Sequence, residues 1–211
     1  MRKDVERNRE HLFQTAQTLL ESKGVNFTFN ELAKEARMGV GTVYRHFDSK
    51  DALLSQLIKD PISQALEIVS NASNETANVA TLRETIFELC EFLIAHKAVA
   101  QIFLGASPTE PLSYQQLMLE NLQKLLTTVK GNDTLREDFQ ATDLPFIFSY
   151  ATYVHTLTSA QNENLWKRYV QALLNGLISE PSAPAPPPLE AESLAQSMLA
   201  NTHRIVTFLQ N

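Results

Sequence analysis

Apolar residues recur at helical spacing along most of the chain, and no segment of any length alternates between apolar and polar residues as a strand would. The first apolar stripe lies within residues 5–23 and ends before Gly24, as a helix with a C-terminal glycine would. Later stripes occupy residues 53–69, 82–94, 99–103, 117–125, 144–158 and 165–178. The pattern predicts an all-α protein built from amphipathic helices.

Residues 28–50 predict two short helices separated by a tight turn. Thr28 and Glu31 have the spacing of a capping box, so the first helix should begin near Phe29. The second helix should run over Val40–His46, after an interruption by glycine. Because two helices this short cannot bury a core alone, we expect a helix-turn-helix whose second helix is held toward a partner.

The exposed face of that second helix carries side chains that suit DNA. A helix of this kind places its N-terminal residues at base edges in the major groove. Gly41 would let the backbone come close, and Thr42 offers bases a hydroxyl and a methyl group. Tyr44, His46 and Lys50 suit phosphates, although Tyr44 and His46 could instead cover a small core. The expected DNA-contacting residues are Thr28, Val40, Gly41, Thr42, Tyr44, Arg45, His46 and Lys50.

The segment GVGTVYRHFDSKDALL, preceded by FTFNELAKEAR, resembles the N-terminal DNA-binding domain of TetR-family transcriptional regulators. The resemblance covers about residues 5–58, and the family pattern reads approximately T-x-x-x-I-A-x-x-A-G-V-S-x-G-T-x-Y-x-H-F-x-x-K-x-x-L. Two residues depart from it. Arg37 stands at the usual turn glycine and is expected to need a positive φ. Gly39 replaces the usual serine cap, which leaves one phosphate contact of the family open.

The resemblance implies a domain plan. Residues 1–50 would form a three-helix, homeodomain-like helix-turn-helix DNA-binding domain, and residues 51–180 an antiparallel helical domain for ligand binding and dimerisation. In the family, the helix after residue 50 joins the two domains. Here it contains Pro61, which predicts a kink, or a break and restart. Residues 71–81 are polar and are expected to form a loop.

Family resemblance also implies a homodimer that reads a near-palindromic, double-stranded DNA operator. Such dimers pair through their last two large helices, here residues 144–158 and 165–178, which carry more apolar surface than one covering layer needs. We expect recognition helices about 34–36 Å apart. Trp166 should lie at or near the dimer interface.

Charge is divided unevenly along the chain. The formal net charge is −6, yet residues 1–50 hold nine Lys and Arg against seven Asp and Glu. This asymmetry favours one DNA-facing end and one acidic end. An N-terminal arm could carry basic side chains to the DNA backbone, with Arg2, Lys3, Arg7 and Arg9 as candidates. The single cysteine, Cys90, suits a reducing compartment, and no run has the length of a membrane helix, so a cytoplasmic protein without membrane contact is expected.

Signatures of catalysis and of metal binding are missing from the sequence. The five histidines share no i, i+3 or i+4 spacing, and there is neither a phosphate-binding glycine loop nor a G-x-S-x-G motif. No catalytic residue, metal site or cofactor is therefore predicted. The rival class, an all-helical enzyme, would place buried carboxylates in the aromatic-rich region, but residues 144–160 contain no Asp or Glu.

Six of the eleven phenylalanines lie between Phe87 and Phe148, which suggests a pocket for a small apolar or aromatic ligand. The alternative is that these rings are only core, in a DNA-binding regulator without small-molecule control. A cavity among residues 82–174 would favour the first reading and full packing the second. In the ligand-controlled form, the helix after residue 50 would act as the lever. The expected ligand-binding residues are His96, Phe103, Tyr114, Met118, Phe146, Tyr150, Tyr153 and His155.

The composition of the chain changes near its C-terminus, where proline becomes frequent. Residues 181–188, PSAPAPPP, cannot form a helix and predict an extended spacer. Residues 189–209 then predict one more amphipathic helix or a partly ordered tail, so residues 181–211 form a third segment.

Overall fold

The computed structural model describes residues 2–104, 112–133, 135–178, 190–193 and 196. The expected spacer at 181–188 and most of the expected helix at 189–209 lie outside these residues. The described part contains helices and no strand, which confirms the all-α prediction. The α-helices are α1 (Arg2–Lys23), α2 (Phe29–Glu35), α3 (Val40–His46), α4 (Lys50–Ala72), α5 (Val79–Ala95), α6 (Lys97–Phe103), α7 (Leu112–Asn132), α8 (Leu144–Thr158) and α9 (Leu165–Ile178), with short 3-10 turns η1 (Gly24–Asn26) and η2 (Ala141–Asp143).

Helix α2 begins where the capping box predicted. The Glu31 N–H donates to Thr28 Oγ1 at 3.2 Å, and the Thr28 N–H donates to Glu31 Oε2 at 2.8 Å. Two N-terminal donors of the helix are thereby satisfied. Arg37 has φ 54°, which confirms the expected positive angle, and Gly39 caps α3 without a side-chain hydrogen bond.

The first helix is longer than expected, since it begins at Arg2 rather than near residue 5. Its basic residues therefore lie on the helix itself, and their contact with the DNA backbone stays a prediction. The Arg9 guanidinium donates to Gln56 Oε1 at 2.9 Å and lies 5.6 Å from the centre of the Phe47 ring. Arg9 thus ties α1 to α4 and to the end of the helix-turn-helix.

Helix α4 runs without a break through Pro61, so the break-and-restart alternative was wrong. Buried Leu57, Ile58 and Ile62 hold both sides of the proline in the core, and packing of this kind offsets one missing hydrogen bond. The expected loop at 71–81 is also shorter, because α4 continues to Ala72 and α5, capped by Asn78, begins at Val79, three residues before the apolar stripe.

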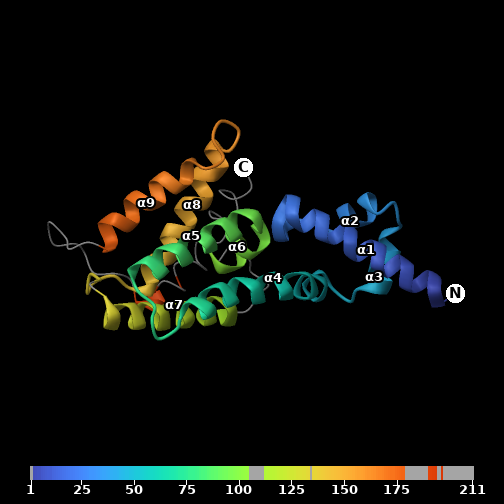
Figure 1. Cartoon of the computed structure of the whole chain (residues 1–211). Helices are drawn as coiled ribbons and strands as arrows, with labels where there is room; N and C mark the ends of the chain where they lie inside the picture. Colours follow the sequence, from blue (N-terminus) through green and yellow to red (C-terminus); the bar gives the residue numbers. More distant parts are fainter. Residues whose placement is uncertain (1, 105–111, 134, 179–189, 194–195, 197–211) are drawn as a thin grey trace.

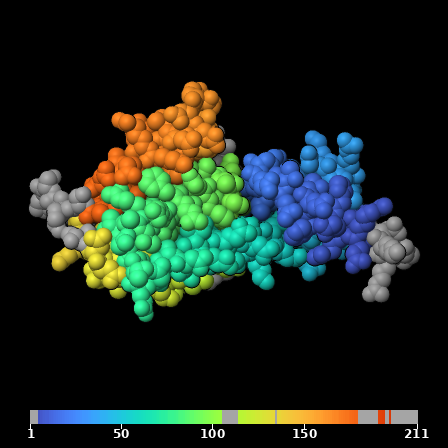
Figure 2. Space-filling model, in the orientation of Figure 1, coloured from blue at the N-terminus to red at the C-terminus, as the bar shows by residue number. Residues whose placement is uncertain are grey.

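The molecule is elongated, with α1–α3 at one end and α5–α9 at the other (Figure 1). Helix α4 belongs to both parts: it begins beside α3 and continues along α5 and α7. Helix α5 packs against α4 on one side and α8 on the other, and α9 packs mainly on α8. The two parts meet where α6 contacts α1, η1 and α4, visible as the junction of blue, green and teal in Figure 2.

Trp166 lies inside the protomer, which corrects the interface expectation. Its side chain is 2% exposed, and its ring lies 5.9 Å from that of Phe87 on α5. Together with Val170 and Leu174 it forms the inward stripe of α9, because residues spaced by four share a helix face.

Candidate functional site

Helix α3, the second helix of the helix-turn-helix, is anchored by two residues and exposes the others. Val43 and Phe47 are buried in the core of the three N-terminal helices. Val40, Gly41, Tyr44 and Arg45 are exposed, while Thr42 and His46 are partly exposed. The spacing of the two anchors leaves one continuous face of α3 free among the described residues. The expected contact residues of α3 therefore share an accessible surface.

The side-chain position of Gly41 is open space within the protomer. A Cβ built at this position would meet no atom within 4 Å, and its φ is not positive. Neither crowding nor backbone strain within the protomer therefore requires glycine here. The open space lies on the face of α3 that would approach a partner, which is compatible with a close backbone approach.

Tyr44 is braced at one edge and free at the other. Its ring makes an edge-on contact with Phe29, at 5.0 Å between ring centres and 73° between planes. The side chain is nevertheless 61% exposed. Phe29 thus limits the directions in which the exposed tyrosine can point.

Lys50 lies at the first turn of α4, where Ser49 caps the helix by accepting from the Ala52 N–H at 3.1 Å. The ammonium group lies 5.6 Å from the centre of the Phe27 ring. Burial lowers the pKa of Lys50 below its ordinary value, and the nearby carboxylates Asp51 and Glu31 oppose that shift. Its half-buried position fixes the cation beside the helix-turn-helix.

The hydroxyl of Thr28 is already engaged in the capping box. It accepts from the Glu31 N–H and donates to Glu31 Oε2 at 3.0 Å. Glu31 also accepts from Lys23 Nζ at 2.5 Å, and this bond, followed by those from Thr28, lowers the pKa of Glu31 to about 2. The primary role of Thr28 visible in the protomer is to start α2.

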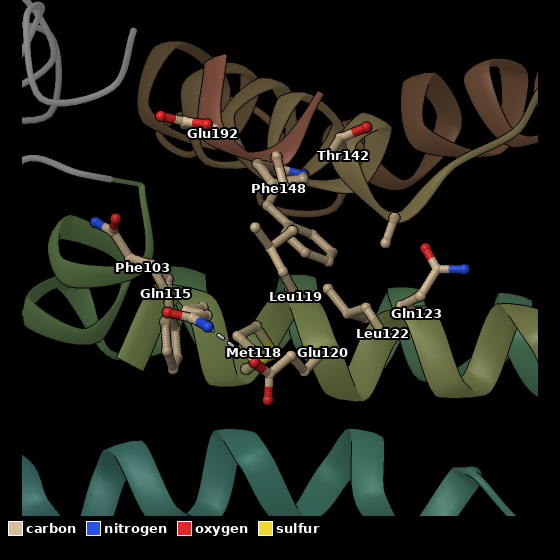
Figure 3. Close-up of a pocket in the computed structure, with 14 residues that line it drawn as sticks. Phe103, Gln115, Met118, Leu119, Glu120, Leu122, Gln123, Thr142, Phe148 and Glu192 are labelled. Carbon is tan, nitrogen blue, oxygen red and sulfur yellow. Dashed lines mark hydrogen bonds between the residues drawn. The ribbon is translucent and has the colours of Figure 1, made fainter. Parts of the chain in front are cut away.

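A cavity of about 530 Å³ lies between α7 and the segment formed by η2 and α8, with Ala191 and Glu192 at its border (Figure 3). Phe103, at the end of α6, closes one end. Most of the wall is apolar. The described lining residues are Phe103, Gln115, Gln116, Met118, Leu119, Glu120, Leu122, Gln123, Ala141, Thr142, Pro145, Phe148, Ala191 and Glu192.

Only Phe103 and Met118 of the eight expected ligand residues line this cavity. Phe146, Tyr150 and Tyr153 instead lie exposed on the outer face of α8. The inward face of α8 is made by Phe148, Ala151 and Thr152 and their helical neighbours, because the 3.6-residue period separates the two sets.

The other three expected ligand residues are also dispersed. His96 stacks on Phe92, with 4.0 Å between ring centres, and borders a small cavity between α1 and α4 at the junction of the two parts. His155 borders a separate cavity of about 310 Å³ beside Lys97. Tyr114 is half-buried against the core. The structure does not bring the eight residues into one site.

Two polar groups in the cavity wall lack a hydrogen-bond partner among the described residues. Gln115 donates through Nε2 to the Ile102 carbonyl at 2.7 Å, but its Oε1 is buried without a partner. The Thr142 hydroxyl is likewise buried and unpartnered. Sequence reasoning missed Gln115, since a glutamine beside an apolar helix stripe gives no signal of its neighbours.

An aromatic and aliphatic surface covers the outer side of α8 and α9. Tyr150 and Tyr169 touch edge to face, with 6.2 Å between ring centres. Leu157 on α8 is 61% exposed, and Leu173 on α9 is also exposed. We call the exposed set Phe146, Tyr150, Tyr153, Leu157, Tyr169 and Leu173 the outer face. It combines large apolar side chains from both helices.

Within the described ranges, no three metal-ligating side chains cluster. Over the same residues, every helix is too short or too polar to cross a membrane.

The exposed recognition helix and the larger helical part behind it define the class: a helix-turn-helix protein with an all-helical C-terminal domain. Residues 12–57 match the family model for bacterial regulatory proteins of the tetR family. The N-terminal domain of the chain is therefore of the TetR type.

A curated protein is similar in sequence to part of this chain. An HTH-type transcriptional regulator of Staphylococcus aureus strain MRSA252 is 32% identical over 103 residues, which cover 48% of this chain and 56% of the relative. The chain thus spans about half the length of the curated relatives it matches.

Two solved structures are similar across most of the chain. SmeT, the repressor of the Stenotrophomonas maltophilia multidrug efflux pump SmeDEF, has a TM-score of 0.58 at 16% identity, covering 86% of this chain and 97% of its own. FadR from Bacillus subtilis, solved with stearoyl-CoA, has a TM-score of 0.51 at 17% identity, covering 81% and 97%. At this identity the likeness concerns the fold.

Proposed function

We propose that the protein is a transcriptional regulator that binds double-stranded operator DNA as a homodimer and is controlled by a small, largely apolar ligand. The observation that carries the DNA-binding part is α3, whose buried anchors Val43 and Phe47 leave a whole face exposed. We assign DNA binding to residues 1–50 and ligand binding and dimerisation to residues 51–180. The Staphylococcus aureus relative is an HTH-type transcriptional regulator, which supports this assignment.

The contacts divide by chemistry. Val40, Gly41 and Thr42 at the start of α3 face base edges, as N-terminal residues of a recognition helix do. Tyr44 and Lys50 contact phosphates and fix the register of the helix. Arg45 and His46 at the end of α3, and Thr28 at the start of α2, complete the phosphate-facing rim.

Dimerisation uses the outer face of α8 and α9. Exposed rings and leucines on two neighbouring helices favour burial against an identical surface, because a two-fold axis makes one apolar patch complementary to itself. The dimer doubles the length of DNA that is read, with half-sites one helical turn apart.

Control by a ligand rests on the cavity between α7 and α8. Its volume of about 530 Å³ and its mostly apolar wall lie within the range of small-molecule sites. Support also comes from FadR, a protein of the same fold whose structure contains stearoyl-CoA, and from SmeT, a repressor. We therefore propose repression that is relieved by ligand.

Capture of fragmented genomic DNA tests the proposed function. The purified protein should enrich one set of fragments that share a near-palindrome, and a Thr42→Ala, Tyr44→Ala double variant should lose that enrichment. The matched control is Thr127→Ala, an exposed position of α7, which should enrich the same set. Equal recovery of all fragments by the wild-type protein at moderate salt would refute operator binding.

A further inference from the structure

Gln101 on α6 is a long polar side chain placed entirely in the interior. Its side chain is 0% exposed, and the other buried polar residues among those described are the threonines Thr85 and Thr152. Each threonine hydroxyl bonds to its own helix, whereas Gln101 reaches another part of the molecule. Gln101 Oε1 accepts from the Val25 N–H, in the turn after α1, at 2.8 Å.

The turn after α1 is shaped around this carboxamide. Gly24 has φ +64°, and a Cβ built on it would lie 2.0 Å from Gln101 Oε1. The bond therefore depends on a glycine on one side and a buried acceptor on the other. It joins the DNA-binding helices to α6 across 76 residues of sequence.

Only one of the two polar groups of the Gln101 carboxamide has a hydrogen-bond partner among the described residues. Gln101 Nε2 is buried and has no hydrogen-bond partner among the described residues. An unmet buried donor opposes the arrangement in which it occurs. A displacement of α6 that gave Nε2 a partner would therefore compensate for part of the lost Val25 bond.

The C-terminal end of α6, which also carries Gln101, borders the cavity. Phe103 lines the wall, and Gln115 donates to the carbonyl of Ile102 in the last turn of α6. Phe103 and Gln115 lie at the same end of the cavity (Figure 3). Adjacent residues of α6, Gln101 and Ile102, thus bond to the DNA-binding helices and to the cavity wall respectively.

We propose that ligand occupancy reaches the DNA-binding domain through α6, by the bonds Gln115–Ile102 and Gln101–Val25, with Gln101 as the positioning residue. The ligand that uses this route is largely apolar and carries a hydrogen-bond donor for Gln115 Oε1. It is neutral or cationic, since the charged residues of the described wall are Glu120 and Glu192. The proposal rests on the ligand control proposed above and replaces α4 as the main lever.

The physical step is a change in the orientation of the Gln115 carboxamide. A donor on the ligand binds Gln115 Oε1, reorients the carboxamide and weakens its bond to the Ile102 carbonyl. The last turn of α6 then shifts, and the Val25 bond is lost with it. A ligand changes DNA affinity only by its different affinity for the two arrangements, and DNA must change ligand affinity by the same factor.

This reciprocity gives the test, with N-phenyl-1-naphthylamine as probe because it is apolar, neutral and has one N–H donor. Its fluorescence reports its affinity for the full-length protein with and without the captured operator fragment. For the wild type we expect operator to weaken probe binding about fivefold or more. For Gln101→Met, which keeps the chain length but removes the acceptor, the ratio should fall to about one while probe and operator each still bind. Thr152→Val, an equally buried change on α8, should keep the wild-type ratio.

Two further measurements address the ligand chemistry. Gln115→Leu should weaken probe binding, because the acceptor is gone. The sulfonated analogue 8-anilino-1-naphthalenesulfonate should bind the wild type several-fold more weakly than the neutral probe. Equal affinity of the two probes, or no effect of Gln115→Leu, would overturn the assigned ligand class.

Failure of the route is distinct from failure of the function. If operator and probe are coupled in the wild type and equally coupled in Gln101→Met, the α6 route is wrong and ligand control stands. If the wild type shows no coupling, ligand control itself fails, and the route with it.

A measurement on the wild-type protein keeps the proposal testable even if a variant does not fold. Hydrogen exchange of the Val25 amide in the wild type should become several-fold faster when probe is added. Unchanged exchange at Val25, alongside a probe-induced loss of operator affinity, would contradict the proposal.

Discussion

Lys50 combines a packing role with a charge role. Its ammonium lies 5.6 Å from the centre of the Phe27 ring, and burial lowers its pKa. Truncation to alanine would remove both the charge and the packed stem. A methionine keeps most of the stem, so it isolates the charge.

We predict that Lys50→Met weakens binding to operator and to unrelated DNA by the same factor. The slope of log affinity against log salt should flatten by roughly one unit, because one phosphate contact is lost. Salt titrations of binding to both DNAs measure this slope. A loss confined to operator, with an unchanged slope, would show that Lys50 does not contact phosphate.

Thr42 should behave in the opposite way. Thr42→Ala removes a hydroxyl and a methyl group from the base-facing start of α3, so it should reduce discrimination between operator and single-base variants by about 1–3 kcal/mol. Binding to unrelated DNA should stay as in the wild type. Competition assays over a set of operator variants provide the measurement, and an unchanged ranking and spread would remove Thr42 from the base-reading set.

Glu31 makes the stability of the start of α2 depend on pH. Its pKa is lowered to about 2, first by the hydrogen bond from Lys23 and then by those from Thr28. A lowered carboxyl pKa means that its stabilisation is complete above the ordinary value of 4.5 and is lost as pH falls toward 2. Exposure to solvent keeps the effect small.

We predict that Glu31→Gln lowers the melting temperature at neutral pH, and that its difference from the wild type shrinks between about pH 4.5 and 2. Melting curves of both proteins across this range provide the measurement. A difference that is constant with pH would mean that the charge of Glu31 contributes nothing to the cap.

At the scale of elements, the junction between α1 and α6 depends on a glycine at position 24. Gly24 combines a positive φ with a Cβ position occupied by Gln101. We predict that Gly24→Ala lowers the free energy of unfolding by about 1–3 kcal/mol through overpacking and backbone strain. In a Gln101→Ala background the loss should shrink to about 1 kcal/mol, the cost of the angle alone.

Gly131→Ala is the matched control for that cycle. Gly131 lies inside α7, and a Cβ there meets nothing within 4 Å. This change should be neutral or stabilise by up to about 1 kcal/mol. Denaturant unfolding compares the variants, and equal losses for Gly24→Ala in both backgrounds would show that its Cβ does not clash with Gln101.

Elements whose ends are marked by local chemistry were the predictable ones. The capping box at Thr28 locates the start of α2 without tertiary information. The continuity of α4 through Pro61 could not be deduced, because it depends on packing around Ile58 and Ile62 from elements distant in sequence.

The expected ligand set failed to gather for a related reason. Aromatic richness in this region suggested a pocket, yet the helical period places Phe146, Tyr150 and Tyr153 on the outer face. Their exposure follows from which side α5 covers, and that is a tertiary property. Gln115 shows the converse, since its unpartnered Oε1 is visible only once α6 and α7 are packed together.

At the scale of the whole molecule, the outer face of α8 and α9 should control assembly. We predict that Leu157→Glu converts the dimer to monomers, because burying an unpaired charge opposes association. Light scattering at micromolar concentration gives the mass. Ser70→Glu, at an exposed position of α4, should leave the dimer intact. A wild-type protein that is itself monomeric, or a Leu157→Glu protein that stays dimeric, would place the interface elsewhere or remove it.

The central claim is that α3 reads a particular DNA sequence. Its most direct test is the ratio of affinities for the captured operator and for a scrambled duplex of equal length and composition, measured by fluorescence anisotropy at one physiological salt concentration. For a sequence-reading dimer we expect a ratio of about 10³ or more. A ratio near one, with both affinities falling equally as salt rises, would show that the protein binds DNA only by charge and would contradict the assignment of α3 as a recognition helix.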